Sequence, residues 1–173
     1  LELLGLKEES LQGDSAIKAI MVPLGVKSTY TGRGYLLTKI PAQASLAWDF
    51  TDCPDLAQTI CVIAAVKDIP LTLTGLESLK VKETDRVLAL QNELKKIGAA
   101  LVEKEANHLY EVTGNFAAVS AIEPIETYDD HRMAMAFAPV AMQKEITLLD
   151  PSVVNKSYPS FWKHVSILLT STL

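Results

Sequence analysis

The chain has 173 residues, of which 49% are hydrophobic and 21% charged, so a hydrophobic core is expected and global disorder is excluded. Its 16 Lys and Arg residues against 21 Asp and Glu residues give a net charge of −5, which argues against a strongly basic nucleic-acid-binding protein. The length suits one domain or two small ones, and no apolar run approaches the roughly 18 residues that a membrane span requires.

The apolar pattern alternates between period 2 and period 3.6, which predicts strands and helices in alternation. In the first part of the chain we expect, in order, a strand over 1–6, a helix over 14–24 ended by Gly25, a hairpin of strands 26–30 and 35–38, a strand over 46–50, and a helix over 54–66. Pro54 suits the first position of that last helix, because its missing N–H would have no helical partner there.

The second part predicts a strand over 71–74, a helix over 82–97, a hairpin of strands 100–103 and 109–112, a helix over 130–142, a strand over 146–149, and a helix over 156–169. The helix over 82–97 has the clearest apolar stripe, and Gly98 follows it as a stop signal.

These elements recur with a fixed spacing. Asp55 and Asp130 lie near two helix starts 75 positions apart, and the same 75 positions separate Gly75 from Asp150. A shared spacing is typical of a domain built from related units. The sequence therefore favours a pseudo-symmetric αβ domain of three units, the first of which matches only the second half of the pattern. The alternative is ordinary α/β alternation with accidental spacing.

Several cations lie where helices are expected to begin. Helix N-termini carry partial positive charge and favour Asp or Glu. The cations in or beside the predicted first turns are Lys82, Arg86, Arg132 and Lys156. A ligand with several negative charges explains this placement, since helix N-termini and cationic side chains both bind anions. The alternative is a solvated charged surface with ordinary ion pairs.

Two carboxylates and a histidine accompany these cations. Asp55 and Glu83 either act as base and acid beside a bound anion, or stabilise a helix start and pair with neighbouring cations. His131 suits either a buried hydrogen bond or a ligand contact. No His, Cys, Asp or Glu set has metal-ligand spacing, so no metal site is predicted. The glycine-rich phosphate-loop and serine-nucleophile motifs are absent too.

Three motifs resemble those of one known family: KETDR (82–86), DHRMAM (130–135) and NKSYP (155–159). Together with LQGD (11–14) and CPD (53–55), they make essentially the whole chain similar to the C-terminal half of the 3-phosphoshikimate 1-carboxyvinyltransferase (EPSP synthase) family. The resemblance implies an α/β fold, an inside-out αβ barrel in which three pseudo-threefold βαβαββ units pack their helices inside and their sheets outside.

The resemblance also implies a domain organisation. Residues 1–173 would be the C-terminal domain of a two-domain enolpyruvyl transferase, with the active site in the cleft between the domains. The chain begins at Leu1 without a methionine, and we expect it to be a fragment of a longer protein. The N-terminal domain, and the opening strand and helix of the first unit, would then be absent from this chain.

Individual residues acquire roles from the same resemblance. Asp55 falls on the family's proton acceptor, which also contacts shikimate 3-phosphate, and Glu83 falls on its proton donor. Lys82 falls on a further shikimate 3-phosphate contact. Many members carry Asn four residues before that lysine, where it binds shikimate 3-phosphate. This sequence has Ser78 there, whose hydroxyl still forms hydrogen bonds but reaches less far.

The implied phosphoenolpyruvate contacts are Arg86, Arg132 and Lys156, with His131 as a supporting contact. The implied reaction transfers the enolpyruvyl group of phosphoenolpyruvate to the 5-hydroxyl of shikimate 3-phosphate and releases phosphate, in the shikimate pathway to chorismate and aromatic amino acids. The partners are these two substrates and the N-terminal domain, with no metal, organic cofactor, nucleic acid or membrane. We expect the complete enzyme to be a cytoplasmic monomer and the isolated chain to be inactive.

Two alternatives stay open on the sequence alone. The sister family, UDP-N-acetylglucosamine enolpyruvyl transferase, shares the implied fold but is not similar in these motifs. In the second alternative the chain as it stands is a folded binding domain without catalysis, because half of the cleft is absent. Turnover measured after adding the missing half distinguishes the two.

Overall fold

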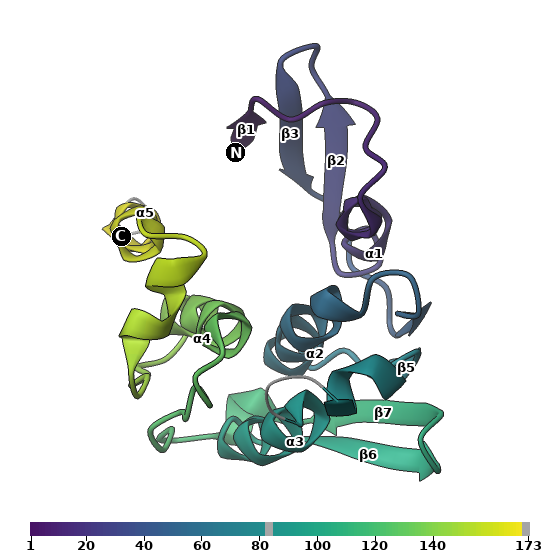
Figure 1. The fold of residues 1–173 in the computed structure, drawn as a ribbon, viewed down its shortest axis with the longest axis vertical. Coiled ribbons are helices and arrows are strands. Elements are labelled where there is room, and N and C mark those ends of the chain that lie inside the picture. The colour runs from purple at the N-terminus through teal and green to yellow at the C-terminus, as the bar shows by residue number, and fades with distance from the viewer. Residues whose placement is uncertain (82–84, 171–173) are drawn as a thin grey trace.

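The computed structural model describes residues 1–81 and 85–170. The chain forms an α/β structure with two separate sheets, one of three strands and one of four. Figure 1 shows the three-stranded sheet at one end of the molecule and the four-stranded sheet toward the other, with helix α2 (Ala57–Val66) between them. The C-terminal helices α4 (His131–Phe137) and α5 (Phe161–Thr170) lie to one side.

The middle of the chain forms one complete βαβαββ unit. Its elements are β4 (Leu46–Asp49), the 3₁₀ segment η2 (Pro54–Leu56) with α2, β5 (Leu71–Thr74), η3 (Glu77–Val81), α3 (Arg86–Lys96), β6 (Ala99–Glu105) and β7 (Leu109–Gly114). The strand order is β4-β5-β7-β6, with β4 parallel to β5 and the other pairs antiparallel. The elements predicted for this stretch are confirmed, except at the start of α3.

The N-terminal part repeats the second half of that unit. Its elements are β1 (Glu2–Leu4), η1 (Gly13–Ala16), α1 (Ile17–Ile20), β2 (Val26–Tyr30) and β3 (Gly34–Lys39). The sheet has the order β1-β3-β2 and is antiparallel throughout, which is the arrangement of β5-β7-β6. The topology therefore agrees with the predicted match of the first unit to the second half of the pattern.

The C-terminal part is less regular than predicted. A short 3₁₀ segment, η4 (Phe116–Ala118), follows β7. The helix expected over 130–142 is present as α4 followed by the 3₁₀ segment η5 (Ala138–Met142). The strand expected over 146–149 is wrong: among the described residues this segment makes a single parallel bridge, between Leu148 and Ile125.

Two helices begin later than predicted. α3 begins at Arg86 with Asp85 as its N-cap, and the earlier positions 82–84 lie outside the described residues. α5 begins at Phe161 instead of Lys156, which ends the 3₁₀ segment η6 (Pro151–Lys156). Pro159 accounts for the delay, because proline disfavours the helical conformation of the residue before it.

Helix α2 lies at the centre of the hydrophobic core. It packs against α3, α4 and β7, and its buried residues go around its circumference: Ala57, Gln58, Ile60, Cys61, Val62, Ala64 and Ala65. A helix that is apolar on all sides belongs in an interior. α5 has no buried residue, so the implied packing of the helices on the inside does not hold for α5 in this chain. The helices nevertheless do not cover one central parallel sheet.

Candidate functional site

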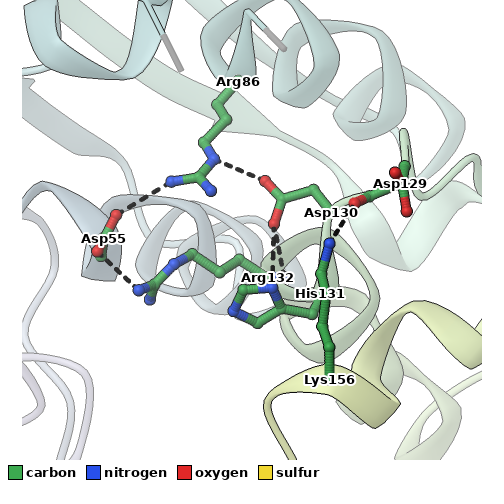
Figure 2. A network of polar contacts seen from close by, with 7 residues as sticks. All are labelled: Asp55, Arg86, Asp129, Asp130, His131, Arg132 and Lys156. Carbon is green, nitrogen blue, oxygen red and sulfur yellow. Dashed lines mark hydrogen bonds and ion pairs between the residues drawn. The ribbon is translucent and has the colours of Figure 1, made fainter. Parts of the chain in front are cut away.

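Two arginines from different helices meet on one carboxylate (Figure 2). Arg86 Nη1 lies 3.1 Å from Asp55 Oδ1, and Arg132 Nη2 lies 2.7 Å from Asp55 Oδ2. Asp55 lies in η2 before α2, Arg86 begins α3, and Arg132 lies in the first turn of α4. We call Arg86 and Arg132 the arginine fork. The starts of these helices therefore converge.

Asp130 fixes the fork from the opposite side. Its Oδ2 accepts a hydrogen bond from Arg86 Nε at 2.6 Å, and its Oδ1 accepts one from the backbone N–H of Arg132 at 2.9 Å. The second bond makes Asp130 the N-cap of α4. The side chains of Arg86 and Asp130 are only 8% and 5% exposed. Separating the partners of a buried ion pair is costly, so the Arg86 guanidinium stays beside Asp130. Because Asp130 also caps α4, this pair fixes the guanidinium relative to that helix.

The turn before α4 is strained. Tyr128 and Asp129 have φ angles of 55° and 52°, a left-handed conformation that residues other than glycine adopt rarely. Such strain persists only where the surrounding structure holds it, and it concentrates at functional sites. The turn directs the Asp129 carbonyl toward Lys156, whose Nζ lies 3.4 Å away (Figure 2). Lys156 is thereby brought to the same side of the molecule as the fork.

Glu93 holds this turn against α3. Its carboxylate is 1% exposed and accepts hydrogen bonds from the Tyr128 hydroxyl at 2.9 Å and from the backbone N–H of Glu126 at 3.0 Å. Lys96 Nζ pairs with it at 2.7 Å. Glu93 therefore connects the helix that carries Arg86 to the turn that leads to Asp130.

A pocket of about 300 Å³ opens beside the fork, lined by Asp55, Leu56, Thr59, His131, Arg132, Met135, Ser157 and Tyr158. Its walls thus come from the starts of α2 and α4 and from the segment after η6. The pocket gives a small ligand access to the carboxylate of Asp55 and the guanidinium of Arg132.

His131 is a partly buried wall of that pocket. Its Nδ1 lies 3.9 Å from Asp130 Oδ1. Burial is the main effect that lowers the pKa of His131 from the usual 6.5; Asp130 opposes it, and the nearby cations Arg132, Lys156 and Arg86 add to it. The lowered pKa means that His131 favours its neutral form.

The structure brings together Asp55, Arg86, Arg132, His131 and Lys156, five of the residues that the sequence singles out. The prediction that Lys156 starts a helix is wrong, because it lies in the last turn of η6. A cation there faces the negative end of the segment, which is the favourable placement.

The other predicted residues lie at or beyond the edge of this cluster. Ser78 is exposed in η3, which lies against the segment η2 that carries Asp55. Lys82 and Glu83 lie outside the described residues.

Sequence reasoning missed Asp130 and Glu93. It used Asp130 only as a marker of a helix start and as part of a motif, although an Asp directly before a helix is a common N-cap signal. Glu93 had no signal, because its partners Glu126 and Tyr128 are 33 and 35 residues away.

A larger cavity lies elsewhere and has a different character. It measures about 890 Å³, lies between α1 and the three-stranded sheet, and has a largely apolar lining that includes Leu3, Ile17, Met21, Tyr35, Leu37 and Ile63.

Within residues 1–81 and 85–170, no three His, Cys, Asp or Glu side chains gather as a metal site. Likewise, none of the helices in the described part of the chain has the length and apolar character needed to cross a membrane.

Comparison with solved structures supports the fold. An EPSP synthase from Acinetobacter baumannii, solved at 2.37 Å, superimposes with a TM-score of 0.72 at 20% identity, covering 95% of this chain and 40% of that one. At this level of identity the match shows the shared fold alone.

Comparison of sequences shows the family. The family model described as EPSP synthase (3-phosphoshikimate 1-carboxyvinyltransferase) matches residues 2–165. A 3-phosphoshikimate 1-carboxyvinyltransferase from Bacteroides fragilis (strain YCH46) is 45% identical over 164 residues, which are 94% of this chain and 40% of the relative. One from Methanospirillum hungatei JF-1 is 33% identical over 164 residues. The chain thus spans about 40% of the length of its relatives, and it belongs to the EPSP synthase family.

Proposed function

We propose that the complete protein transfers the enolpyruvyl group of phosphoenolpyruvate to the 5-hydroxyl of shikimate 3-phosphate and releases phosphate. The observation that carries this proposal is the arginine fork, in which the guanidiniums of Arg86 and Arg132 lie within 3.1 Å and 2.7 Å of one carboxylate. Phosphoenolpyruvate carries a carboxylate and a phosphate. Paired guanidiniums bind a carboxylate strongly and directionally, and Lys156 supplies a further cation.

The proposed chemistry needs an acid that acts on one substrate and a base that acts on the other. Glu83 protonates the methylene carbon of phosphoenolpyruvate, which leaves cationic character at C2. The 5-hydroxyl of shikimate 3-phosphate attacks C2 while Asp55 takes its proton. The tetrahedral adduct then loses phosphate and a methyl proton to give 5-enolpyruvylshikimate 3-phosphate. Lys82 and Ser78 contact shikimate 3-phosphate, and His131 supports the phosphoenolpyruvate site. No step calls for a metal or an organic cofactor.

We further propose that residues 1–173 are the C-terminal domain of this enzyme and part of an inside-out barrel with pseudo-threefold symmetry. In the complete unit, β4 pairs with the outer side of β5, and α2 packs against β7 and α3. The corresponding places in the first unit are the free edge of β1 and the 890 Å³ apolar cavity beside α1. A strand and a helix from the rest of the protein fit both. The N-terminal domain then closes the cleft over the fork in a cytoplasmic, monomeric enzyme.

A chimera tests the activity. The aligned C-terminal segment of the Bacteroides fragilis relative is replaced by this chain, and phosphate release is followed with both substrates. We expect turnover with shikimate 3-phosphate as the acceptor. Turnover only with UDP-N-acetylglucosamine would favour the sister enzyme, and no turnover by a folded chimera would contradict the proposal.

Matched variants connect the activity to the fork. Arg132→Ala in the chimera should raise the KM for phosphoenolpyruvate sharply, because it removes a charge-assisted contact to an anion. Arg33→Ala removes an exposed arginine on the β2–β3 hairpin and should leave KM unchanged. The 173-residue chain alone should show no turnover, since an open cleft cannot exclude water.

A further inference from the structure

The arginine fork already holds a carboxylate, and that carboxylate belongs to the protein. Asp55 presents one oxygen to Arg86 and the other to Arg132. This bridging geometry is the one by which two guanidiniums bind the carboxylate of a ligand. We propose that Asp55 is an internal stand-in for the ligand carboxylate, and that a carboxylate ligand binds the fork by exchanging with Asp55. The proposal rests on the proposed function and adds to it an order of events.

The fork itself is the fixed part of this arrangement. Arg86 is 8% exposed and is held through its Nε by Asp130, which is itself 5% exposed. Asp130 also caps the helix that carries Arg132. The guanidinium of Arg86 therefore keeps its place whether or not Asp55 pairs with it.

Asp55 is the part that can leave. Its side chain is 28% exposed and that of Arg132 is 32% exposed, and both line the 300 Å³ pocket. An aspartate has a short side chain, so a rotation about its side-chain torsions is enough to take its oxygens off the fork. The pocket provides both the path for the incoming carboxylate and the space for the outgoing one.

Simple addition of a second carboxylate is unfavourable. Two carboxylates that share a site repel each other unless one is protonated. A ligand that brought its carboxylate to the fork while Asp55 remained there would meet this repulsion. Exchange avoids it, because Asp130 stays in place and only one further carboxylate, that of Asp55 or that of the ligand, lies on the fork at a time.

The exchange also orders the reaction. While Asp55 bridges the arginines, each of its two oxygens lies against a guanidinium N–H group and is held on the fork. Arrival of the ligand carboxylate frees these oxygens for another donor, such as an acceptor hydroxyl. Asp55 thus becomes available as proton acceptor when the substrate that carries the carboxylate binds. It stays paired with the arginines when that substrate is absent.

Binding of pyruvate tests the exchange without requiring turnover. Pyruvate carries the carboxylate but no phosphate, and its affinity is measured by titration calorimetry on the 173-residue chain and on the chimera. Asp55→Asn keeps the side-chain size and removes the competing charge. If the fork is open in about 1–10% of wild-type molecules, the variant should bind pyruvate about 10–100-fold more tightly. Arg132→Ala should abolish this gain in the double variant.

Controls separate exchange from other effects. Asp52→Asn changes the net charge equally at an exposed neighbouring residue and should leave the affinity unchanged. If Asp55→Asn melts early, Asp55→Ser provides a second variant with no charge. Unchanged or weaker pyruvate binding by the folded Asp55 variants, or no binding by any variant, would overturn the proposal. A failure of the chimera to turn over, with tighter pyruvate binding by Asp55→Asn, would instead contradict the proposed function alone.

Discussion

At the residue scale, Arg86 has an acidic partner on two sides. Asp130 lies 2.6 Å from its Nε in a largely buried ion pair, and Asp55 lies 3.1 Å from its Nη1 at the pocket wall. The two carboxylates differ in exposure, 5% against 28%, and therefore in how easily they move. Asp130 is therefore held in place, whereas Asp55 faces the 300 Å³ pocket. Two aspartates on one arginine thus differ in mobility because they differ in burial.

The acid–base assignment predicts large effects on turnover. In the complete enzyme, Asp55→Asn and Glu83→Gln keep the side-chain size but remove the base and the acid. Each should lower kcat by about 10²–10⁴-fold, the usual range for general acid–base catalysis. Steady-state kinetics and a melting curve are measured on the same preparations. Near-normal kcat with a lowered melting temperature would show that the two groups are only structural.

His131 predicts a pH dependence of stability. Its pKa in the folded chain lies below the unfolded 6.5, so the unfolded chain binds more protons as the pH falls below about 6.5. His131 therefore costs no stability above that pH and lowers stability as the pH falls below it. Urea midpoints at pH 7.5 and 5.5 should show a smaller loss for His131→Asn than for the wild type. Replacing the exposed His108 by Asn should keep the wild-type loss.

Gln58 predicts a stabilising substitution. Both amide atoms of its side chain are buried and have no hydrogen-bond partner among the described residues. An unsatisfied buried polar group costs about 1–3 kcal/mol. Gln58→Met keeps the length and should raise the free energy of unfolding by about that amount. Gln91→Met, which loses a hydrogen bond to the Leu101 carbonyl, should give no gain. Destabilisation by Gln58→Met would show that the amide has a partner after all.

At the element scale, the site depends on how α3 and α4 are joined. The turn at Tyr128 and Asp129 is left-handed, and Glu93 on α3 holds it through two hydrogen bonds. The position of Asp130 at the start of α4 follows from that attachment. The helices therefore carry the arginines, but the turn decides how the arginines face each other.

Removing this attachment should be costly. Glu93→Ala leaves the Tyr128 hydroxyl and the Glu126 N–H without their acceptor and deprives Lys96 of its buried partner. We expect a loss of about 3–5 kcal/mol, as for other buried ion pairs that lose one member. Glu111→Ala breaks the exposed pair with Lys104 and should cost less than about 1 kcal/mol. Urea unfolding of both variants gives the comparison; equal small losses would mean that Glu93 does not hold the turn.

At the scale of the whole molecule, α2 joins the parts of the chain. It packs on α3, α4 and β7, and the cavity beside α1 reaches its Ile63. The two cysteines lie in this core, with Cys53 3% and Cys61 0% exposed. Burial raises the pKa of both thiols, which keeps them protonated and unreactive.

Thiol labelling therefore reports on the core of the isolated chain. Neither cysteine should react with a water-soluble disulfide reagent in the folded chain, because the thiolate is the reactive form. Both should become reactive together as urea unfolds the chain, at the same midpoint as the loss of helical circular dichroism. Rapid labelling of Cys61 without urea would show that α2 is not packed in this way when the chain is alone.

The sequence by itself determined the order of the elements. Period-2 and period-3.6 patterns depend on neighbouring residues, so they predicted the complete middle unit and the N-terminal hairpin closely. The same local signals placed Arg86 and Arg132 at helix starts, and the 75-residue spacing related the start at Asp130 to the one at Asp55. The motifs also carried the resemblance to the EPSP synthase family.

Only the tertiary structure decided what holds the site together. The pairing of Asp130 with Arg86 joins residues 44 positions apart, and the contacts of Glu93 reach 33 and 35 positions along the chain. Periodicity carries no information about such distant partners. Distant contacts also decided that 146–149 forms no strand and that α5 is exposed, so periodicity could not predict either. A strand needs a partner segment beside it along its length, and a helix is buried only where another surface covers it.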